Sequence, residues 1–216
     1  QDYFVPSIVF NKEHTPSEKL ILQRIAHDEQ LQKTVCDFLA AADTGITGIE
    51  VKKKDSDQNK GEEKESSYLF SFKHATPYGD MSLPSWLESE GTLHLFYYIE
   101  PLVITLHYGA LLAIDELDSS LHPLLVRHIV DMFQSPKLNK HGAQLIFTTH
   151  DATLLQSDPP LLRRDQIWLV EKQKDQASDL YSLAEVKGQE RADFLRSYLR
   201  GLYGGIPLLR EWRNEE

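Results

Sequence analysis

The sequence predicts an α/β fold with a parallel sheet core, a helical lobe and an added β-hairpin. Two short apolar runs, 111–114 and 144–147, are each followed directly by polar residues, and a helical pattern over 119–133 separates them. A strand–helix–strand unit of about 40 residues forms a right-handed crossover between parallel strands. Because parallel strands bring their carboxyl ends to one edge of a sheet, the polar residues there predict a ligand site.

The N-terminal half predicts the helical lobe and the hairpin. Residues 1–10 are expected to be irregular or extended, and apolar positions at helical spacing predict a helix over 18–42. A strand begins at 49–51 and a second runs over 68–72, while the highly charged stretch 52–67 between them is typical of an exposed loop. The two strands together predict a β-hairpin with a long polar tip.

The remaining elements alternate between helices and strands. Turn-forming residues predict a link over 76–84, and the helical pattern over 86–106 is interrupted at Pro101. The elements expected after the central unit are a helix from 151 that ends before Pro159-Pro160, a strand over 166–170, its hairpin partner over 180–183, and a last helix over 190–202.

Composition and charge exclude several classes of protein. The 216 residues are 41% hydrophobic and 26% charged, and no apolar run is long enough to span a bilayer, so we expect no membrane partner. The single cysteine, Cys36, excludes an intrachain disulfide framework and favours a cytoplasmic location. The formal net charge of -10 argues against a main nucleic-acid-binding surface.

Two adjacent acids end the first apolar run, and a histidine follows the second. Unpaired carboxylates at the end of a buried strand are energetically costly. The presence of Asp115-Glu116 at this position therefore indicates a functional role. Mg²⁺-dependent nucleotide hydrolysis supplies one, because the first acid can hold the metal and the second can orient or deprotonate the attacking water. Asp115 is therefore the candidate metal ligand and Glu116 the candidate base. His150 is placed to contact a γ-phosphate.

These residues together resemble a known family. Residues 111–116 look like the Walker B strand of ABC-type ATPases, Asp118 and the serines after it look like the D-loop, and His150 looks like the switch histidine. Upstream, Ser89-Glu90-Gly91-Thr92 matches the shortened signature motif of RecF-like and overcoming-lysogenization-defect-like ATPases. The chain is similar to the prokaryotic AAA-class branch of ABC-type ATPases found with toxin–antitoxin and phage-defence genes. The implied fold is a P-loop NTPase of ABC-ATPase type.

The resemblance implies ATP and Mg²⁺ as cofactors and a homodimer with ATP at its interface. Ser89, Gly91 and Thr92 would lie at the N-terminus of a helix, where free N–H groups and the helix dipole favour an anion. In the family this motif faces the γ-phosphate bound by the opposite protomer, and Asp118 lies at the same interface. The implied site is therefore composite, with Glu116 and His150 on one protomer and the signature motif on the other.

The resemblance also divides the chain into functional parts. We expect a helical and signature lobe with the hairpin insertion over 1–109. An ATPase core lobe, from Walker B to the switch histidine and the following strands, is expected over 110–185, and a C-terminal helix and tail over 186–216. Residues 38–51 and 166–172 are similar to the same branch, so the resemblance extends over most of the chain.

One part of the family pattern does not occur in the sequence. There is no Gly-x-x-x-x-Gly-Lys-[Ser/Thr] loop in the 216 residues, so they lack the phosphate cradle, its lysine and a hydroxyl ligand for Mg²⁺. In the family this loop lies near the N-terminus. We therefore interpret the sequence as the C-terminal part of an ATPase, with the loop upstream or on another chain, and expect little or no ATP hydrolysis by this chain alone.

The sequence leaves three functions open. The first is an ATP-driven switch that dimerises around ATP and regulates a partner effector, a nuclease or toxin, in phage defence or a toxin system. The second is a non-catalytic ATPase-like scaffold that binds a partner protein. The third is a DNA-repair-type ATPase that reaches DNA or RNA through its complex. Each motif also has a local alternative, since Asp115-Glu116 and Ser89-Glu90-Gly91-Thr92 are both suited to capping helices.

Overall fold

The computed structural model describes residues 7–10, 18–53, 68–156, 160–186 and 194–207. The chain divides into two compact units, Gln1–His150 and Asp151–Glu216, which are described separately below. The functional parts expected at 1–109, 110–185 and 186–216 follow motifs rather than compactness, and they stay a prediction.

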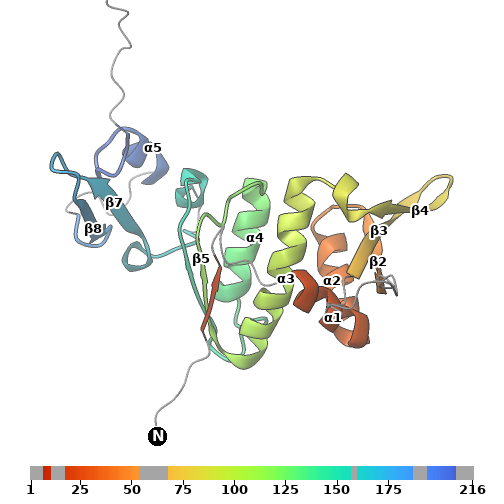
Figure 1. Ribbon diagram of the computed structural model, residues 1–216. Helices are drawn as coiled ribbons and strands as arrows, with labels where there is room; N and C mark the ends of the chain where they lie inside the picture. Colours follow the sequence, from red (N-terminus) through yellow and green to blue (C-terminus); the bar gives the residue numbers. More distant parts are fainter. Residues whose placement is uncertain (1–6, 11–17, 54–67, 157–159, 187–193, 208–216) are drawn as a thin grey trace, which may run out of the picture. The chain divides into compact units, whose positions relative to one another are not determined.

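A three-stranded parallel sheet carries the strands that the central apolar runs predict. Its order is β1 (Ser7–Phe10), β5 (Leu111–Ile114) and β6 (Gln144–Phe147), with β5 in the middle. The crossover helix α4 (Pro123–Gln134) contacts β6 (Figure 1), so the predicted strand–helix–strand unit is confirmed. The segment expected to be irregular or extended contains β1, which pairs with β5 in parallel across about a hundred intervening residues.

The helix expected over 119–133 begins four residues later than predicted. His122 caps α4 at its N-terminus, because its Nδ1 accepts a hydrogen bond from the Leu124 N–H at 3.2 Å. Pro123 occupies the first helical position, where its missing N–H costs nothing. Residues 115–121 are therefore left as an irregular loop between β5 and α4.

Two helices stand where the sequence predicts one over 18–42. They are α1 (Glu18–His27) and α2 (Glu29–Ala41). Asp28 separates them in an extended conformation, and its carboxylate accepts a hydrogen bond from the Leu31 N–H at 2.9 Å. An aspartate that bonds the backbone in this way starts a new helix instead of continuing the old one.

An antiparallel sheet forms next to these helices. Its order is β2 (Ile46–Lys53), β3 (Tyr68–Thr76) and β4 (Gly79–Pro84), so the predicted hairpin of the first two strands is confirmed. The turn-rich link expected over 76–84 is wrong, because β4 pairs with β3 along its whole length. Most of the predicted polar tip, 54–67, lies outside the described residues.

A long helix joins the two sheets of the first unit. After a 3₁₀ turn, η1 (Ser85–Leu87), the helix α3 (Glu90–Tyr108) runs between the antiparallel and the parallel sheet (Figure 1). Pro101 lies inside the helix, which continues past it to Tyr108. Phe96 of α3 is fully buried against the antiparallel sheet, with its ring centroid 5.1 Å from that of Phe70 and 5.4 Å from that of Phe72.

The second unit is a small hairpin with short helical turns. β7 (Trp168–Lys172) and β8 (Ser178–Ser182) form the expected antiparallel pair. The helix expected from 151 is the 3₁₀ turn η2 (Ala152–Leu155), and a further 3₁₀ turn, η3 (Arg164–Gln166), precedes β7. The last helix, α5 (Phe194–Leu199), ends earlier than the predicted 202, and residues 190–193 lie outside the described part of the chain.

No helix in the described part of the chain has the length and apolar character needed to cross a membrane.

Candidate functional site

A single hydroxyl group joins the ends of the two central strands. Thr148, directly after β6, donates its Oγ1 hydrogen to Asp115 Oδ1 at 2.6 Å, and Asp115 directly follows β5. The same Oγ1 accepts a hydrogen bond from the Glu116 N–H at 2.7 Å. Main-chain hydrogen bonds between the two segments continue beyond the ends of β5 and β6, because the Leu117 N–H donates to the Thr148 carbonyl at 3.0 Å. Thr148 thus holds the carboxylate of Asp115 and the backbone of Glu116 from the neighbouring strand.

A second link joins the same two segments a few residues further along each, between Asp118 and His150. The His150 N–H lies 3.2 and 3.3 Å from the two carboxylate oxygens of Asp118, which accept its hydrogen bond. The backbone that carries His150 is therefore held by a side chain from the β5–α4 loop. Of the residues predicted for the site, the structure brings together Asp115, Glu116, Asp118 and His150 at the carboxyl ends of β5 and β6.

The β5–α4 loop reverses direction around two buried leucines. Leu117 is fully buried and Leu121 is 8% exposed, so these side chains anchor the loop to the core. Glu116 has φ 53° and Ser120 has φ 59°, both in the left-handed region that L-residues other than asparagine and aspartate seldom adopt. Such conformations persist where surrounding contacts impose them, and they cluster at functional sites.

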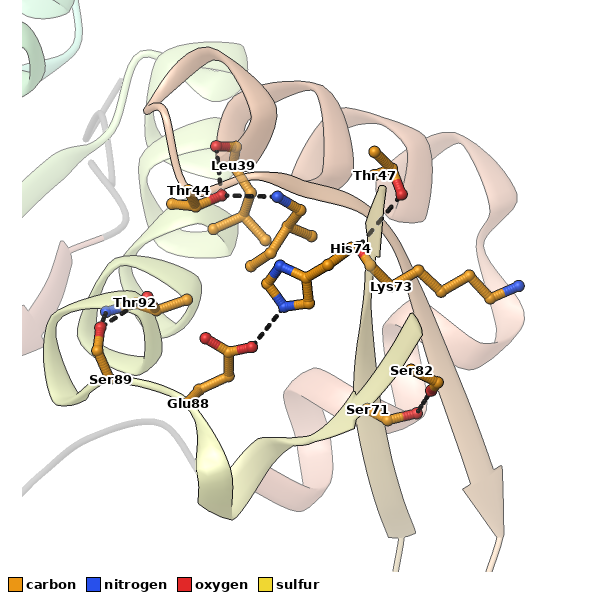
Figure 2. Close-up of polar contacts among 11 residues, drawn as sticks. Leu39, Thr44, Thr47, Ser71, Lys73, His74, Ser82, Glu88, Ser89 and Thr92 are labelled. Atoms are coloured by element: carbon orange, nitrogen blue, oxygen red, sulfur yellow. Dashed lines mark hydrogen bonds and ion pairs between the residues drawn. The ribbon is translucent and has the colours of Figure 1, made fainter. Parts of the chain in front are cut away.

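The predicted signature motif forms the first turn of α3. Ser89 is the N-cap, and its Oγ accepts a hydrogen bond from the Thr92 N–H at 3.1 Å and lies 2.8 Å from Thr92 Oγ1 (Figure 2). The capping role that the sequence allows is therefore present. It leaves the other free N–H groups of this turn pointing along the axis of a 19-residue helix.

The signature turn packs directly on the β5–α4 loop of the same chain. A Cβ atom on Gly91 would lie 2.5 Å from the Ser120 carbonyl oxygen, so only glycine allows this approach. His94 Nδ1 lies 3.0 Å from the Ser119 carbonyl oxygen, which can only accept, so this nitrogen donates. The motif and the candidate catalytic loop are thus in contact within one protomer.

Tyr98 belongs to this contact and was not singled out from the sequence. The side chain is 8% exposed. Burial raises the pKa of its phenol, and the nearby negative charges of Asp118 and Glu116 raise it further. Gly91, His94 and Tyr98 lie three and four positions apart, which places them on one face of α3. That spacing is the signal by which a sequence reading could have found Tyr98.

The donor set at the strand ends fits a nucleotide-bound metal ion better than a metal held by protein alone. Among the described residues, no group of three or more His, Cys, Asp or Glu side chains is placed to hold a metal ion. Mg²⁺ needs only one or two carboxylates when phosphate oxygens and waters complete its octahedron. Asp115, exposed beside β5, is such a carboxylate.

Comparisons with known proteins identify a family for most of the first unit. Residues 20–156, more than half of the chain, match the family model described as "AAA domain, putative AbiEii toxin, Type IV TA system". No curated protein matches the chain. A solved structure of an SmcHead bound to the C-winged helix domain of ScpA is similar at 13% identity and a TM-score of 0.46, over 79% of this chain.

The chain spans about half of that solved chain, 51% of its length. The family match confirms both the predicted fold class, a P-loop NTPase, and the resemblance to AAA-class ATPases of toxin–antitoxin type. The chain belongs to the AAA-domain family described as "putative AbiEii toxin, Type IV TA system".

Proposed function

We propose that this chain supplies the metal-binding, water-activating and phosphate-sensing side chains of an ATP-hydrolysing ABC-type ATPase. The observation that carries the proposal is the convergence of Asp115, Glu116, Asp118 and His150 at the ends of β5 and β6, through the Thr148 hydroxyl and the Asp118 carboxylate. A plain helix cap explains none of these cross-strand bonds, since they tie the loop to β6 and not to α4.

Each residue has a distinct role in this proposal. Mg²⁺-bound ATP supplies the phosphoryl group and the positive charge that stabilises its transfer. Asp115 holds the metal directly or through water. Glu116 orients the attacking water and accepts its proton. His150 contacts the γ-phosphate, and Thr148 positions both acids from the adjacent strand.

The second half of the site comes from another copy of the chain. Ser89, Gly91 and Thr92 would bind the γ-phosphate of the nucleotide on the opposite protomer, with Asp118 at the same interface. The N-terminus of α3 supports this, because its N–H groups and dipole favour an anion. ATP binding would then favour a homodimer.

The dimer would control a partner. The family description names a toxin–antitoxin system, which supports a partner protein. That partner would be an effector such as a toxin or nuclease, acting in phage defence or a toxin system. DNA or RNA would be reached through the complex, since the net charge of -10 does not favour direct binding. The single Cys36 fits action in the cytoplasm.

The substitution Glu116→Gln in the intact protein tests the role of the base. It keeps the shape of the side chain but removes its ability to accept a proton, so ATP turnover should fall by about 10²- to 10⁴-fold. ATP-dependent dimers should accumulate and be visible by size-exclusion chromatography with light scattering. The matched control is Asp131→Asn, an exposed acid on α4 away from the loop. Turnover that stays unchanged in Glu116→Gln contradicts the assignment.

A non-catalytic scaffold is the second candidate function, and one observation favours it. The 216 residues contain no Gly-x-x-x-x-Gly-Lys-[Ser/Thr] loop. Calorimetric titration of this chain with Mg²⁺-ATP tests whether nucleotide binding needs that loop. Tight binding by these residues alone would show that they do not need that loop. Partner capture that persists in Asp115→Ala and Glu116→Gln without any nucleotide would favour the scaffold.

A further inference from the structure

A buried acid precedes the signature turn. The Glu88 side chain is 7% exposed, and its Oε1 lies 2.6 Å from Nε2 of His74, whose side chain is 19% exposed. Figure 2 shows the imidazole pointing from β3 toward this carboxylate. A carboxylate removed from water in this way is costly unless a hydrogen-bonding partner compensates it. The distance between these two atoms is that of a short hydrogen bond.

The position of Glu88 gives the pair its influence on the signature turn. Glu88 ends the 3₁₀ turn η1, where its N–H donates to the Ser85 carbonyl at 3.0 Å, and the next residue is the N-cap Ser89. Both residues are extended, with ψ of 160° and 148°. Fixing the side chain of Glu88 therefore fixes the direction in which the backbone enters α3. That direction sets where Ser89 and Thr92 present their hydroxyl groups.

His74 belongs to the middle strand of the antiparallel sheet, so the pair connects that sheet to α3. Its backbone neighbours are Ile46 on β2 and Met81 on β4. The other ring nitrogen, Nδ1, faces the turn before β2, since a Cβ atom on Gly45 would lie 3.8 Å from it. The imidazole is thus held between this turn and Glu88.

The same sheet also contacts α3 through apolar packing. Phe70 and Phe72 lie against Phe96, in the second turn of the helix, and all three side chains are buried. The aromatic cluster fixes how the body of α3 lies on the sheet. The polar pair fixes where the first turn begins. The two contacts therefore control different degrees of freedom of the same helix.

We propose that Glu88, held by His74, is a positioning residue for Ser89-Glu90-Gly91-Thr92, and that the β2–β3–β4 sheet thereby sets how this turn meets the nucleotide of a second copy. The inference rests on the proposed function, because it requires the turn to act on the opposite protomer. A pair that merely stabilises the fold would damage the protomer that carries the mutation. A positioning pair damages the site on the other protomer.

Mixed dimers of the intact protein separate these two cases. His74→Ala alone should lower ATP turnover by about 10- to 100-fold, as for misplaced binding groups. When His74→Ala is mixed with Glu116→Gln, each mixed dimer contains one site with an intact base and an intact signature turn. Random pairing should then restore about a quarter of the wild-type sites. A parallel mixture of Ser89→Arg with Glu116→Gln tests the composite site by itself.

Conservative variants and a neighbouring ion pair provide the controls. Glu88→Gln replaces the carboxylate with an amide whose oxygen can still accept a hydrogen bond from the imidazole, so it should keep more turnover than Glu88→Ala. If His74→Ala does not fold, Glu88→Ala takes its place in the mixture and Glu88→Gln is the control. Lys73→Ala removes an ion pair in which Lys73 Nζ lies 2.9 Å from Glu50 Oε1. Lys73 adjoins His74 on β3, and its side chain points away from Glu88 (Figure 2). This variant should keep wild-type turnover.

The outcomes assign failure to one proposal or the other. Restoration in both mixtures supports the positioning role. Restoration with Ser89→Arg but not with His74→Ala overturns it and leaves the composite site standing. Restoration in neither mixture contradicts the composite site, and the positioning role with it. Wild-type turnover in folded His74→Ala also overturns the positioning role.

Discussion

The two sheets of the first unit hold their functional residues in opposite ways. The parallel sheet has strands of four residues, and the polar groups at its edge, Asp115 and Thr148, are exposed and joined by hydrogen bonds. The antiparallel sheet has longer strands, and its contact with α3 is a buried aromatic cluster with one partly buried polar pair, His74 and Glu88.

The two sheets therefore contribute differently to stability and to chemistry. Burial of aromatic rings contributes several times more free energy than an exposed hydrogen bond. Mutations in the antiparallel sheet should therefore act mainly on folding. Mutations at the edge of the parallel sheet should act mainly on activity, with small effects on folding. The four predictions below test this division, from the largest expected effect on stability to the smallest.

Phe72→Ala should be the most destabilising of the four substitutions. The side chain is fully buried and packs edge-on against Phe70 and Phe96. Loss of the ring leaves a cavity, so the free energy of unfolding should fall by about 3–5 kcal/mol in urea denaturation. Leu69→Ala, on the same strand but 48% exposed, is the control and should change it by less than about 1 kcal/mol. Equal losses in the two variants would contradict the division.

Gly91→Ala should destabilise the contact between the signature turn and the β5–α4 loop. The new Cβ would lie 2.5 Å from a backbone oxygen, that of Ser120, which cannot swing away as a side chain does. Overpacking of this kind costs about 1–3 kcal/mol, which outweighs the helix propensity of alanine. Glu90→Ala, the exposed neighbour, is the control. Thermal unfolding distinguishes the variants, and a higher melting temperature for Gly91→Ala would refute the close approach.

Thr148→Val should reduce stability less than Gly91→Ala does, but it should reduce ATP turnover strongly. Valine keeps the shape of threonine but cannot bond to Asp115 or to the Glu116 N–H. Because these groups are exposed to water, the free energy of unfolding should fall by only about 1 kcal/mol. ATP turnover of the intact protein should drop well below the wild-type rate, since both acids lose their anchor. Thr148→Ser restores the hydroxyl and should recover most of the turnover.

Tyr98→Phe should change how stability depends on pH in the alkaline range. The pKa of Tyr98 is raised in the folded protein by burial and by the charges of Asp118 and Glu116. In the unfolded chain a tyrosine loses its proton near about pH 10. The stabilisation is therefore complete below about pH 10 and is lost as pH rises through the higher folded pKa.

The measurement is the free energy of unfolding as a function of pH. Above about pH 10 it should fall less steeply in Tyr98→Phe than in the wild type. Tyr78→Phe is the control, because the Tyr78 side chain is fully exposed. A slope in Tyr98→Phe that equals the wild-type slope would contradict the raised pKa of the buried phenol.

The sequence predicts the parts of the fold that depend on local pattern. The apolar runs before Asp115 and Thr148 indicate the parallel pair, and the two flanks of the charged stretch indicate the hairpin. Strand β4 was not predicted, because Gly79-Asp80-Met81-Ser82 has the composition of a turn. Only its pairing with β3 makes this segment a strand. The pairing of β1 with β5 links distant segments, which no local pattern reveals.

The candidate site divides in the same way. Residue types and order are enough to propose roles for Asp115, Glu116 and His150, and these roles stay predictions. The bonds that hold them are not readable from the sequence, since Thr148 could point to either face of the sheet. The contact of Gly91 with Ser120 is likewise a property of packing. The helical spacing from Gly91 to Tyr98 is visible in the sequence. An amphipathic helix, however, contains many groups of residues at this spacing, so the spacing alone does not single out Tyr98.

The backbone conformation at Glu116 affects which substitutions selection would favour at this position. A φ of 53° costs a glutamate roughly 1–2 kcal/mol that a glycine would not incur. Selection for thermal stability alone would therefore favour Glu116→Gly, which would also remove the proposed base. A library screened only for heat resistance should enrich glycine at this position, while one screened for ATP-dependent output should retain glutamate. Comparing the two enrichments measures how strongly function opposes folding at a single residue.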